Sequence, residues 1–402
     1  MLENVSIDKL SLKNKKVLVR VDFNVPLDNG EITDDWRINS ALPTIEKIIK
    51  SGGIPILISH LGRPKGQKVK ELSLEPVSKR LSQLLPDNLG ANVIFIDDCI
   101  GEKVENAIKK AKIGDCFLLE NLRFYKEETD NNPDFSKNLS RLADVYIDDA
   151  FATAHREHAS TVGVIEYFDE VGAGYLLIKE IKNLGYLLES PKEPFTAILG
   201  GIKLSTKLKL IEKLLPKINR LVIGGGMSFT FFKALGLEIG KAPYEEEFIM
   251  KASKLLQGQG LDSKILLPVD LIVSDSIDNP EKIETVSYEN LQPHHYAPDI
   301  GDHTIELFKS AIFSSETIFV NGPMGVFEKE QFEAGTMLIF EALVKAVENG
   351  TFVVAGGGDT LSALKKFGFR GKLSWESTGG GASLKFIENG TLPAIEALLN
   401  KK

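Results

Sequence analysis

Four short β-branched segments in the first half of the chain are each followed by residues that can bind an anion. The four segment ends read Arg20-Val-Asp22-Phe-Asn24-Val-Pro26, Ser59-His60-Leu-Gly62-Arg63-Pro64, Glu120-Asn121-Leu-Arg123-Phe124 and Asp148-Asp149-Ala-Phe-Ala-Thr-Ala-His155-Arg156-Glu-His158. Ligands of open α/β sheets bind beyond the carboxyl ends of the strands, so these residues are expected at one shared edge. The arginine fork matches phosphate and carboxylate groups, which predicts a small phosphorylated and carboxylated ligand there. Asp22 and Asn24 would then bind its hydroxyl groups.

The distribution of arginine supports this pocket. The chain has nine Arg, and seven of them come before residue 157: Arg20, Arg37, Arg63, Arg80, Arg123, Arg141 and Arg156. A single Arg is more often a solvated or ion-paired surface residue, and chance clustering is the alternative explanation. Arg63, Arg123 and Arg156 at three of the four segment ends, with Arg37 at the start of the first helix, favour the anion pocket.

The segment ends of the second half are rich in glycine instead. They read Leu199-Gly200-Gly201-Ile-Lys203-Leu-Ser-Thr206-Lys207, Gly224-Gly225-Gly226, Asn321-Gly322-Pro323-Met-Gly325-Val-Phe-Glu328, Gly356-Gly357-Gly358-Asp359-Thr360 and Ser377-Thr378-Gly379-Gly380-Gly381. Glycine lets a phosphate reach the backbone N–H groups, although each triplet alone is explained by a tight turn. Together with Lys203, Lys207 and Asp359 beside Thr360, they predict a nucleoside triphosphate with Mg²⁺.

Other nucleotide-binding classes are disfavoured. The P-loop pattern is missing, and so is the dinucleotide fingerprint at any strand-to-helix turn, which argues against a P-loop NTPase and against a dehydrogenase. The Cys and His spacing suggests no structural metal site.

The elements that must position these residues alternate along the chain. Strands are expected at 17–21, 54–59, 93–96, 116–119, 145–147, 196–199, 221–223, 265–269, 317–320 and 351–355. Helical patterns lie between them at 40–50, 75–85, 205–215 and 334–348. This alternation predicts the α/β class, with parallel sheets covered by helices on both faces. A helix at 175–189, between Gly-rich and Pro-rich breakers within 167–194, is expected to connect two halves rather than to be one more crossover.

The composition is that of an ordinary globular protein. The 402 residues carry a net charge of -8, 43% are hydrophobic, and two are Cys. At roughly 150 residues per domain, two or three domains are expected, and disordered or fibrous classes are excluded. The acidic balance argues against broad nucleic-acid binding. The two Cys, the lack of a signal-type segment and the lack of a spanning apolar run predict a cytoplasmic protein without a membrane partner.

The chain resembles the phosphoglycerate kinase family from its first strand to its last helix. The most specific motifs are Val19-Arg20-Val21-Asp22-Phe23-Asn24-Val25-Pro26, Asn321-Gly322-Pro323-Met324-Gly325-Val326-Phe327-Glu328, Gly356-Gly357-Gly358-Asp359-Thr360 and Ser377-Thr378-Gly379-Gly380-Gly381. The resemblance implies two Rossmann-like lobes with an interlobe cleft. Its domains would be a phosphoglycerate-binding domain at 1–170, a connecting helix at 171–189, a nucleotide-binding domain at 190–385, and a tail at 386–402 returning to the first domain.

The resemblance also implies the reaction and its residues. The reaction is reversible phosphoryl transfer between 1,3-bisphosphoglycerate with ADP and 3-phosphoglycerate with ATP, in a monomer, with Mg²⁺ as cofactor. The implied substrate-binding residues are Asp22, Phe23, Asn24, Arg37, His60, Leu61, Gly62, Arg63, Arg123 and Arg156. The implied nucleotide-binding residues are Gly201, Lys207, Gly225, Gly301, Asn321, Glu328, Gly357, Gly358, Asp359 and Thr360, with Glu328 at the ribose and Asp359 at the metal. The implied catalytic groups are Arg37, Lys203 and the backbone of Gly379, Gly380 and Gly381, with no general base and with hinge closure of the lobes.

Three positions depart from the family pattern. Thr206 stands where many members carry Asp, a change that leaves Lys207 in place. Trp375 stands where a His usually bonds a connector Glu, here Glu180, so the hinge interaction is expected to differ. Asp302 replaces a usual Pro after Gly301. The alternative to an active kinase is a nucleotide-binding scaffold that keeps the fold without the activity. That alternative would be favoured if Arg37, Lys203, Lys207 or Asp359 were lost.

Overall fold

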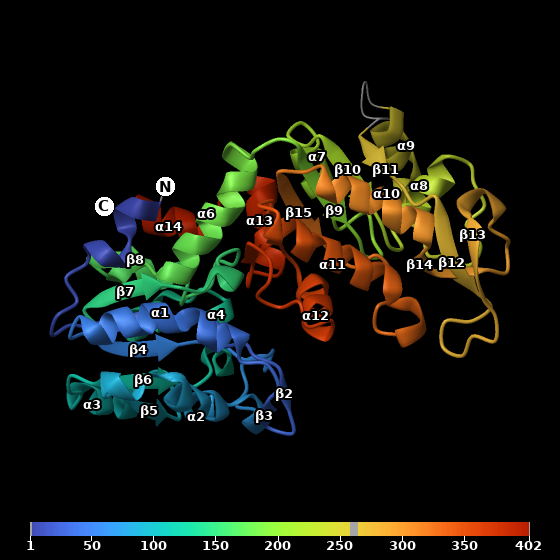
Figure 1. Ribbon diagram of the computed structural model, residues 1–402. Coiled ribbons are helices and arrows are strands. Elements are labelled where there is room, and N and C mark those ends of the chain that lie inside the picture. Colours follow the sequence, from blue (N-terminus) through green and yellow to red (C-terminus); the bar gives the residue numbers. More distant parts are fainter. Residues whose placement is uncertain (1, 258–263, 402) are drawn as a thin grey trace. The chain divides into compact units, whose positions relative to one another are not determined.

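Two six-stranded parallel sheets organise the protein (Figure 1). The computed structural model describes residues 2–257 and 264–401. The chain divides into one compact unit of Met1–Lys182 with Thr391–Lys402 and a second unit of Asn183–Gly390. The expected α/β class with two lobes of parallel strands is confirmed.

The sheet of the first unit has six parallel strands. Their order is β5 (Asn92–Ile96), β6 (Asp115–Leu119), β4 (Ile54–Ile58), β1 (Lys16–Arg20), β7 (Val145–Asp148) and β8 (Glu170–Ala173). A hairpin of β2 (Leu27–Asp28) and β3 (Glu31–Ile32) follows β1. The helices are α1 (Trp36–Lys50), α2 (Glu75–Leu84), α3 (Glu102–Lys109), α4 (Lys126–Thr129) and α5 (Pro133–Ser140).

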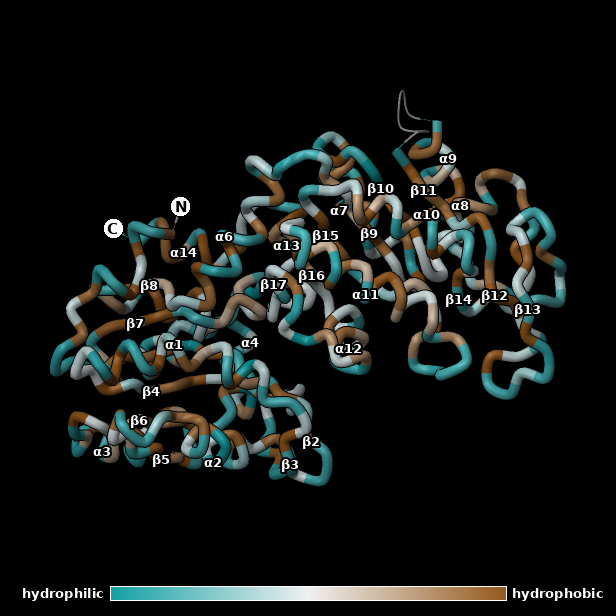
Figure 2. The backbone as a smooth tube through the Cα atoms, viewed as in Figure 1, coloured by the Kyte–Doolittle hydropathy of each residue, from teal (hydrophilic) through white to brown (hydrophobic). Residues whose placement is uncertain are grey.

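The strands of this sheet are hydrophobic because the sheet is packed between helices. All five residues of β4 are buried, and the strand is mostly hydrophobic (Figure 2), as expected for a parallel strand with helices on both faces of its sheet. Val17 and Val19 of β1 share a core with Ile45 of α1 and Val77 of α2. The register sets Arg20 beside Ile58 of β4 and Asp148 of β7. The carboxyl ends of the three central strands therefore lie at one level.

A long helix and a C-terminal helix complete this unit. Helix α6 (Tyr175–Glu189) has the bounds expected from the sequence, and the division between the units falls after Lys182, within it. At its start, Asp149 Oδ1 accepts hydrogen bonds from the backbone N–H of Leu176 at 2.8 Å and of Leu177 at 3.2 Å. Helix α14 (Pro393–Asn400) contacts β8, and Ala394 N–H donates to the carbonyl of Ala154 at 3.1 Å.

The second unit has its own parallel sheet. Its order is β11 (Ile265–Leu266), β10 (Arg220–Ile223), β9 (Phe195–Leu199), β15 (Thr317–Asn321), β16 (Phe352–Ala355) and β17 (Trp375–Glu376). The helices are α7 (Leu208–Leu214), α8 (Ser228–Ala234), α9 (Ile249–Gln257), α10 (Asp302–Phe313), α11 (Ala334–Glu348), α12 (Gly358–Lys366) and α13 (Gly381–Asn389).

A three-stranded antiparallel sheet in this unit was not expected. It consists of β13 (Ile283–Ser287), β12 (Asp270–Ser274) and β14 (Tyr296–Ile300). The expected strand 265–269 is wrong, because β11 ends at Leu266 and β12 begins at Asp270. Pro268 lies between them, and a proline has no N–H with which to continue a ladder. Helices α10 and α11 share a hydrophobic core with both sheets of this unit.

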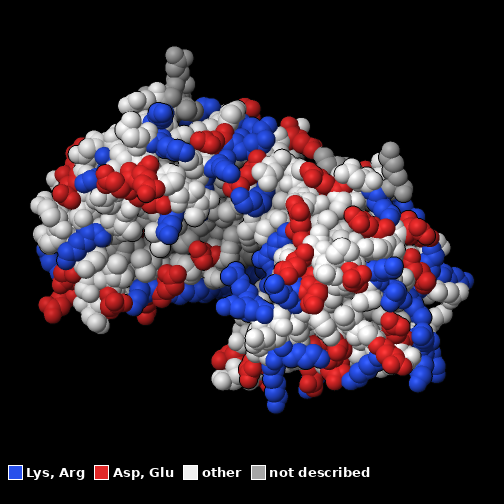
Figure 3. Space-filling view, turned by 180° about the vertical axis from the view of Figure 1, so that it is seen from behind, with Lys and Arg blue, Asp and Glu red and all other residues white. Residues whose placement is uncertain are grey.

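The surface carries mixed charges, as the composition predicts. Lys and Arg are interspersed with Asp and Glu over the face seen in Figure 3. Within residues 2–257 and 264–401, no helix is long and apolar enough to cross a membrane.

Candidate functional site

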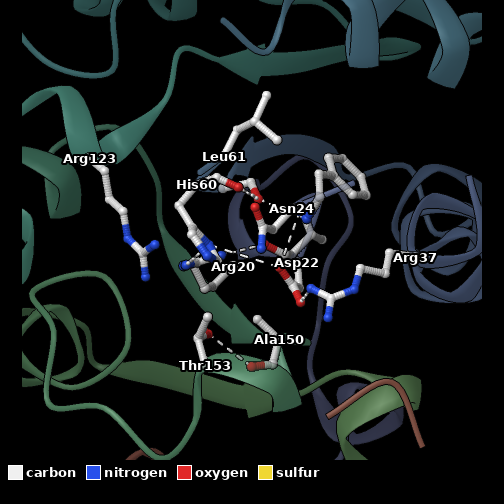
Figure 4. Close-up of polar contacts among 12 residues, drawn as sticks. Arg20, Asp22, Asn24, Arg37, His60, Leu61, Arg123, Ala150 and Thr153 are labelled. Atoms are coloured by element: carbon white, nitrogen blue, oxygen red, sulfur yellow. Dashed lines mark hydrogen bonds and ion pairs between the residues drawn. The ribbon is translucent and has the colours of Figure 1, made fainter. Parts of the chain in front are cut away.

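The carboxyl ends of β1 and β4 bring Asp22, Arg37 and His60 together in the first unit (Figure 4). Arg37, in the first turn of α1, forms an ion pair through Nη1 with Oδ2 of Asp22. The Asp22 side chain is buried, and its Oδ1 lies 3.9 Å from His60 Nδ1. The same Oδ1 accepts a hydrogen bond from the Asn24 N–H at 3.2 Å. These predicted substrate residues thus form one polar cluster.

His60 is buried beside Arg20, the last residue of β1. Arg20 Nη2 lies 3.1 Å from His60 Nδ1, and a guanidinium can only donate, so Nδ1 accepts and Nε2 carries the ring proton. Burial, together with the charges of Arg20, Arg123, Arg156 and Arg37, lowers the pKa of His60 well below its usual value. His60 is therefore a neutral imidazole at pH 7.

Phe23, Leu61 and Gly62 support the cluster through their backbones. The Phe23 N–H donates to Ser59 Oγ at 2.9 Å, and the Gly62 N–H donates to Asn24 Oδ1 at 2.9 Å. The side chains of Phe23 and Leu61 belong to the hydrophobic core. Their part in the site is to hold the two strand ends together.

A cationic cavity of about 320 Å³ lies in the same unit. It is lined by Arg63, Lys65, Gly66, Arg123, Thr129, Arg156 and His158. Arg123 also donates from Nη1 to the carbonyl of Gly62 at 2.8 Å, which ties the cavity to the Asp22 cluster. Burial and the charges of Arg156 and Arg20 lower the pKa of Arg123 to about 10. Burial and other nearby arginines also lower the pKa of Arg156. Cations so close together form a site prepared for a polyanion.

The structure thus brings Arg63, Arg123 and Arg156 to this cavity, while Asp22, Asn24, Arg37 and His60 form the neighbouring cluster. Sequence reasoning did not select Lys65, Thr129 or His158. His158 is the last residue of the fourth strand-end motif and Lys65 lies two residues after Arg63, so the position of both next to predicted anion-binding residues could have identified them. Thr129 had none, because it ends the short helix α4 rather than a strand.

A second cavity, of about 330 Å³, lies in the second unit. Of the residues predicted to bind the nucleotide, Gly201, Gly225, Glu328 and Asp359 line it. Most of the other lining residues are apolar, among them Phe229, Tyr296, Pro298 and Met324. Of these four, Met324 lies in a motif of the sequence, and none was predicted to bind the nucleotide. A glycine edge, two exposed carboxylates and an apolar wall suit a nucleotide, which has a flat apolar base and charged phosphates.

Lys207 and Asn321 form a buried hydrogen-bonded set behind this cavity. Lys207 Nζ donates to the carbonyl oxygens of Gly200 at 2.6 Å and of Asn321 at 2.8 Å, and also to Asn321 Oδ1. Burial lowers the pKa of Lys207 to about 7, against the attraction of Asp359. A Cβ built on Gly201 would lie 3.7 Å from Nζ, so the ammonium is close to the cavity wall.

The N-terminus of α12 contributes Gly357, Gly358, Asp359 and Thr360. Gly357 precedes the helix, and Thr360 Oγ1 accepts from the Gly322 N–H and donates to the Gly356 carbonyl, both at 2.7 Å. The first turn of a helix favours anions through its free N–H groups, and α12 has nine residues. Asp359 and Thr360 thus lie at a helix start beside the cavity.

Five further predicted positions of the second unit line neither cavity and belong neither to the Lys207 set nor to the start of α12. Gly301 precedes α10, where its N–H donates to the Asp270 carbonyl at 3.0 Å, and it does not line the cavity as its neighbour Ile300 does. Lys203 is exposed before α7, and Gly379 to Gly381 lead into α13, which contacts α7.

A magnesium ion fits the donor set at the second cavity. In the described part of the chain, no group of three or more His, Cys, Asp or Glu could hold a metal ion. Mg²⁺ is commonly held by one or two carboxylates together with substrate phosphates. The exposed carboxylate of Asp359 meets that requirement, with Glu328 on the same cavity.

Two parallel-sheet units, one with an arginine-lined cavity and one with a glycine-edged cavity, define an α/β protein with one site suited to a small polyanion and one suited to a nucleotide. The sequence model of the family described as phosphoglycerate kinase matches residues 7–390. A phosphoglycerate kinase of Dictyoglomus turgidum is 49% identical over 97% of each chain, and that of Chloroherpeton thalassium is 45% identical over 99% of this chain and 100% of its own. The structure of phosphoglycerate kinase from Coxiella burnetii superposes with a TM-score of 0.86 at 39% identity, covering 98% of each chain.

The chain belongs to the phosphoglycerate kinase family. The expected enzyme class, a phosphotransferase acting as a glycolytic kinase, is confirmed. The roles of the individual residues remain predictions, which the geometry makes specific.

Proposed function

We propose that, in the reversible phosphoryl transfer between 1,3-bisphosphoglycerate and ADP, the first unit of this kinase binds the phosphorylated acid and the second unit binds the nucleotide. The observation that carries the proposal is the contrast between the two cavities. One is lined by three arginines and a lysine, and the other by glycine backbone, apolar side chains, one lysine and the carboxyl groups of Asp299, Glu328 and Asp359. The first suits the small phosphorylated acid, and the second suits the nucleotide.

Arg63, Arg123 and Arg156 bind the ester phosphate of the acid in the first unit. The lowered pKa values of Arg123 and Arg156 support this role, because a bound dianion would relieve the repulsion that lowers them. Asp22 and Asn24 bind the hydroxyl group, and His60 offers one N–H donor. Phe23, Leu61 and Gly62 hold these side chains in register.

The nucleotide occupies the cavity of the second unit. Glu328 binds the ribose, while Gly201, Gly225, Lys207 and the start of α12 bind the phosphates. Asn321 orients Lys207 through its side-chain oxygen, and Gly301 acts indirectly through Ile300. Mg²⁺, bound at Asp359 with the nucleotide phosphates, would supply charge neutralisation on the transferring group.

Arg37, Lys203 and the backbone N–H groups of Gly379, Gly380 and Gly381 stabilise the charge that develops during transfer. An acyl phosphate is already activated, and its acceptor is a phosphate oxygen, so no general base is required. Arg37 is paired with Asp22 in this structure, so it must exchange that partner for the transferring phosphoryl group.

We further propose that residues 1–170 and 190–385 act as the acid and nucleotide domains, joined through 171–189, with the tail 386–402 returning to the first. Closure about the connector brings the substrates together and excludes water, to which acyl phosphates are labile. The protein acts as a cytoplasmic monomer without nucleic-acid or membrane partners.

A coupled assay with 3-phosphoglycerate and ATP, with and without Mg²⁺, tests the proposal. Turnover that requires all three components is expected. Normal nucleotide binding by calorimetry without turnover would replace the kinase with a nucleotide-binding scaffold. Turnover unaffected by magnesium removal would refute the role of Asp359.

A further inference from the structure

Glu128 is a buried carboxylate next to the cationic cavity, and the mechanism above gives it no role. It lies on α4, beside Thr129, which lines the cavity, and its side chain is fully buried. Oε1 accepts a hydrogen bond from Ser160 Oγ at 2.6 Å, and Oε2 accepts from the Ser160 N–H at 3.0 Å. Its backbone carbonyl accepts from the Ala159 N–H at 2.9 Å. Glu128 is thus fastened to the segment that follows Arg156.

Glu128 lies between His158 and the hydroxyl group that Arg20 contacts. His158, which lines the cavity, has its Nδ1 3.6 Å from Glu128 Oε1, an ion-pair distance when the ring is protonated. On the other side, Arg20 Nε donates to Ser160 Oγ at 2.9 Å, and the same hydroxyl donates to Glu128. Arg20 in turn contacts His60. One carboxylate therefore connects the cavity with the Asp22 cluster.

The charge state of Glu128 supports this connection. Burial alone would raise its pKa, but the nearby His158 ring, the charge of Arg20 and the hydrogen bonds from Ser160 outweigh burial and leave the pKa below its usual value. Glu128 also counteracts the lowering of the Arg123 pKa. A buried carboxylate among several cations reduces their repulsion and limits their side-chain freedom.

We infer that Glu128 is a positioning residue for the acid substrate: it holds His158 against the cavity and, through Ser160, fixes Arg20 beneath His60. His158, which lines the cavity, is oriented by this contact toward the ligand. The inference rests on the proposed function, in that the cavity binds the phosphate of 3-phosphoglycerate. Removing the carboxylate should therefore weaken acid binding and spare the nucleotide, which binds to the other unit.

The test compares Glu128→Gln, His158→Gln and the double variant in the coupled assay. Glu127→Gln is the matched control, because Glu127 is the exposed neighbour. We expect Glu128→Gln and His158→Gln each to raise KM for 3-phosphoglycerate at least fivefold, with KM for ATP changed less than twofold. Because His158 is held by its contact with Glu128, removing both side chains should raise KM no further than Glu128→Gln alone.

Three results would overturn the inference. They are an unchanged KM for 3-phosphoglycerate in Glu128→Gln, effects of the two variants that multiply, or an equal rise of KM for ATP. If Glu128→Gln does not fold, Ser160→Ala cuts the link to Arg20 and should raise the same KM; a folded Ser160→Ala enzyme with unchanged KM refutes the relay. An inactive wild-type protein would refute the proposed function instead, and calorimetric binding of 3-phosphoglycerate to the same variants would then decide the positioning role.

Discussion

Nucleotide binding is expected to take up a proton at Lys207. Burial lowers the pKa of this ammonium from 10.5 to about 7, which corresponds to about 5 kcal/mol in favour of the neutral amine at about 1.4 kcal/mol per unit. Three oxygens surround Nζ, those of the Gly200 and Asn321 carbonyls and the Asn321 amide, and they match the three donors of the charged form. A nucleotide phosphate at the adjacent wall would add a negative charge and restore the ammonium.

The magnitude follows from the titration. With a pKa of about 7, roughly nine tenths of Lys207 is neutral at pH 8 and about one tenth at pH 6. Binding of ADP with Mg²⁺ should therefore take up close to one proton at pH 8 and about a tenth of one at pH 6. Between pH 7 and pH 8.5 the dissociation constant should rise roughly fifteenfold, because binding must recruit a proton that becomes scarce.

Isothermal titration calorimetry in two buffers of different ionisation enthalpy measures this uptake. ADP itself titrates near neutral pH, so Lys207→Met supplies the background to be subtracted. Lys209→Met is the matched control, because Lys209 is exposed on the following helix. Equal proton uptake at pH 8 by wild type and Lys207→Met would refute the reasoning, as would an unchanged affinity in Lys207→Met.

Three further outcomes are expected. Arg37→Ala should lower kcat about 10²-fold or more while changing KM for 3-phosphoglycerate little, because its charge is matched in the transition state; steady-state kinetics that show only a KM effect would contradict the role. Burial raises the pKa of Asp149 to about 8, so between about pH 4 and 8 the native state binds a proton that the unfolded state has lost. The free energy of unfolding should therefore fall by up to about 1.4 kcal/mol per pH unit over this range. Urea unfolding of Asp149→Asn should show a shallower pH dependence than the wild type, and an identical slope would exclude this linkage. Trp375→His should alter closure with both substrates bound, and an unchanged small-angle scattering profile would count against a hinge role.

The parallel architecture was predictable because its strands are short, hydrophobic and bounded by breakers. Helix α6 has its expected bounds for the same reason, since breakers flank it on both sides. The antiparallel sheet was not predictable in this way. Its strand β13 is exposed to partly buried along its length, and Pro268 falls within the run that was interpreted as one strand. Weak burial leaves little periodic signal in a sequence.

The candidate site shows a similar division. Arg63, Arg123 and Arg156 lie in the loops that follow β4, β6 and β7, so the strand-end rule was sufficient to group them. Thr129 and Glu128 reach the same region from α4, and their contacts depend on how that helix packs on the segment around Ser160. Such tertiary neighbours carry no spacing signal. The apolar wall of the second cavity was missed likewise, because Phe229 and Tyr296 come from elements far apart in the chain.

A net charge of -8 is compatible with two polyanionic substrates because the positive charge is concentrated locally at the two cavities. Burial and crowding there make the charged forms of the basic side chains less stable. In the first unit, crowding and burial lower the pKa of Arg123, and in the second, burial lowers the pKa of Lys207. Each cation is thus less stable in the free protein than in water, and an anionic ligand would relieve that penalty. If these residues bind the substrates as proposed, part of the binding free energy would come from the relief of this penalty, and acid affinity should depend on Glu128, which offsets the same repulsion in the absence of ligand.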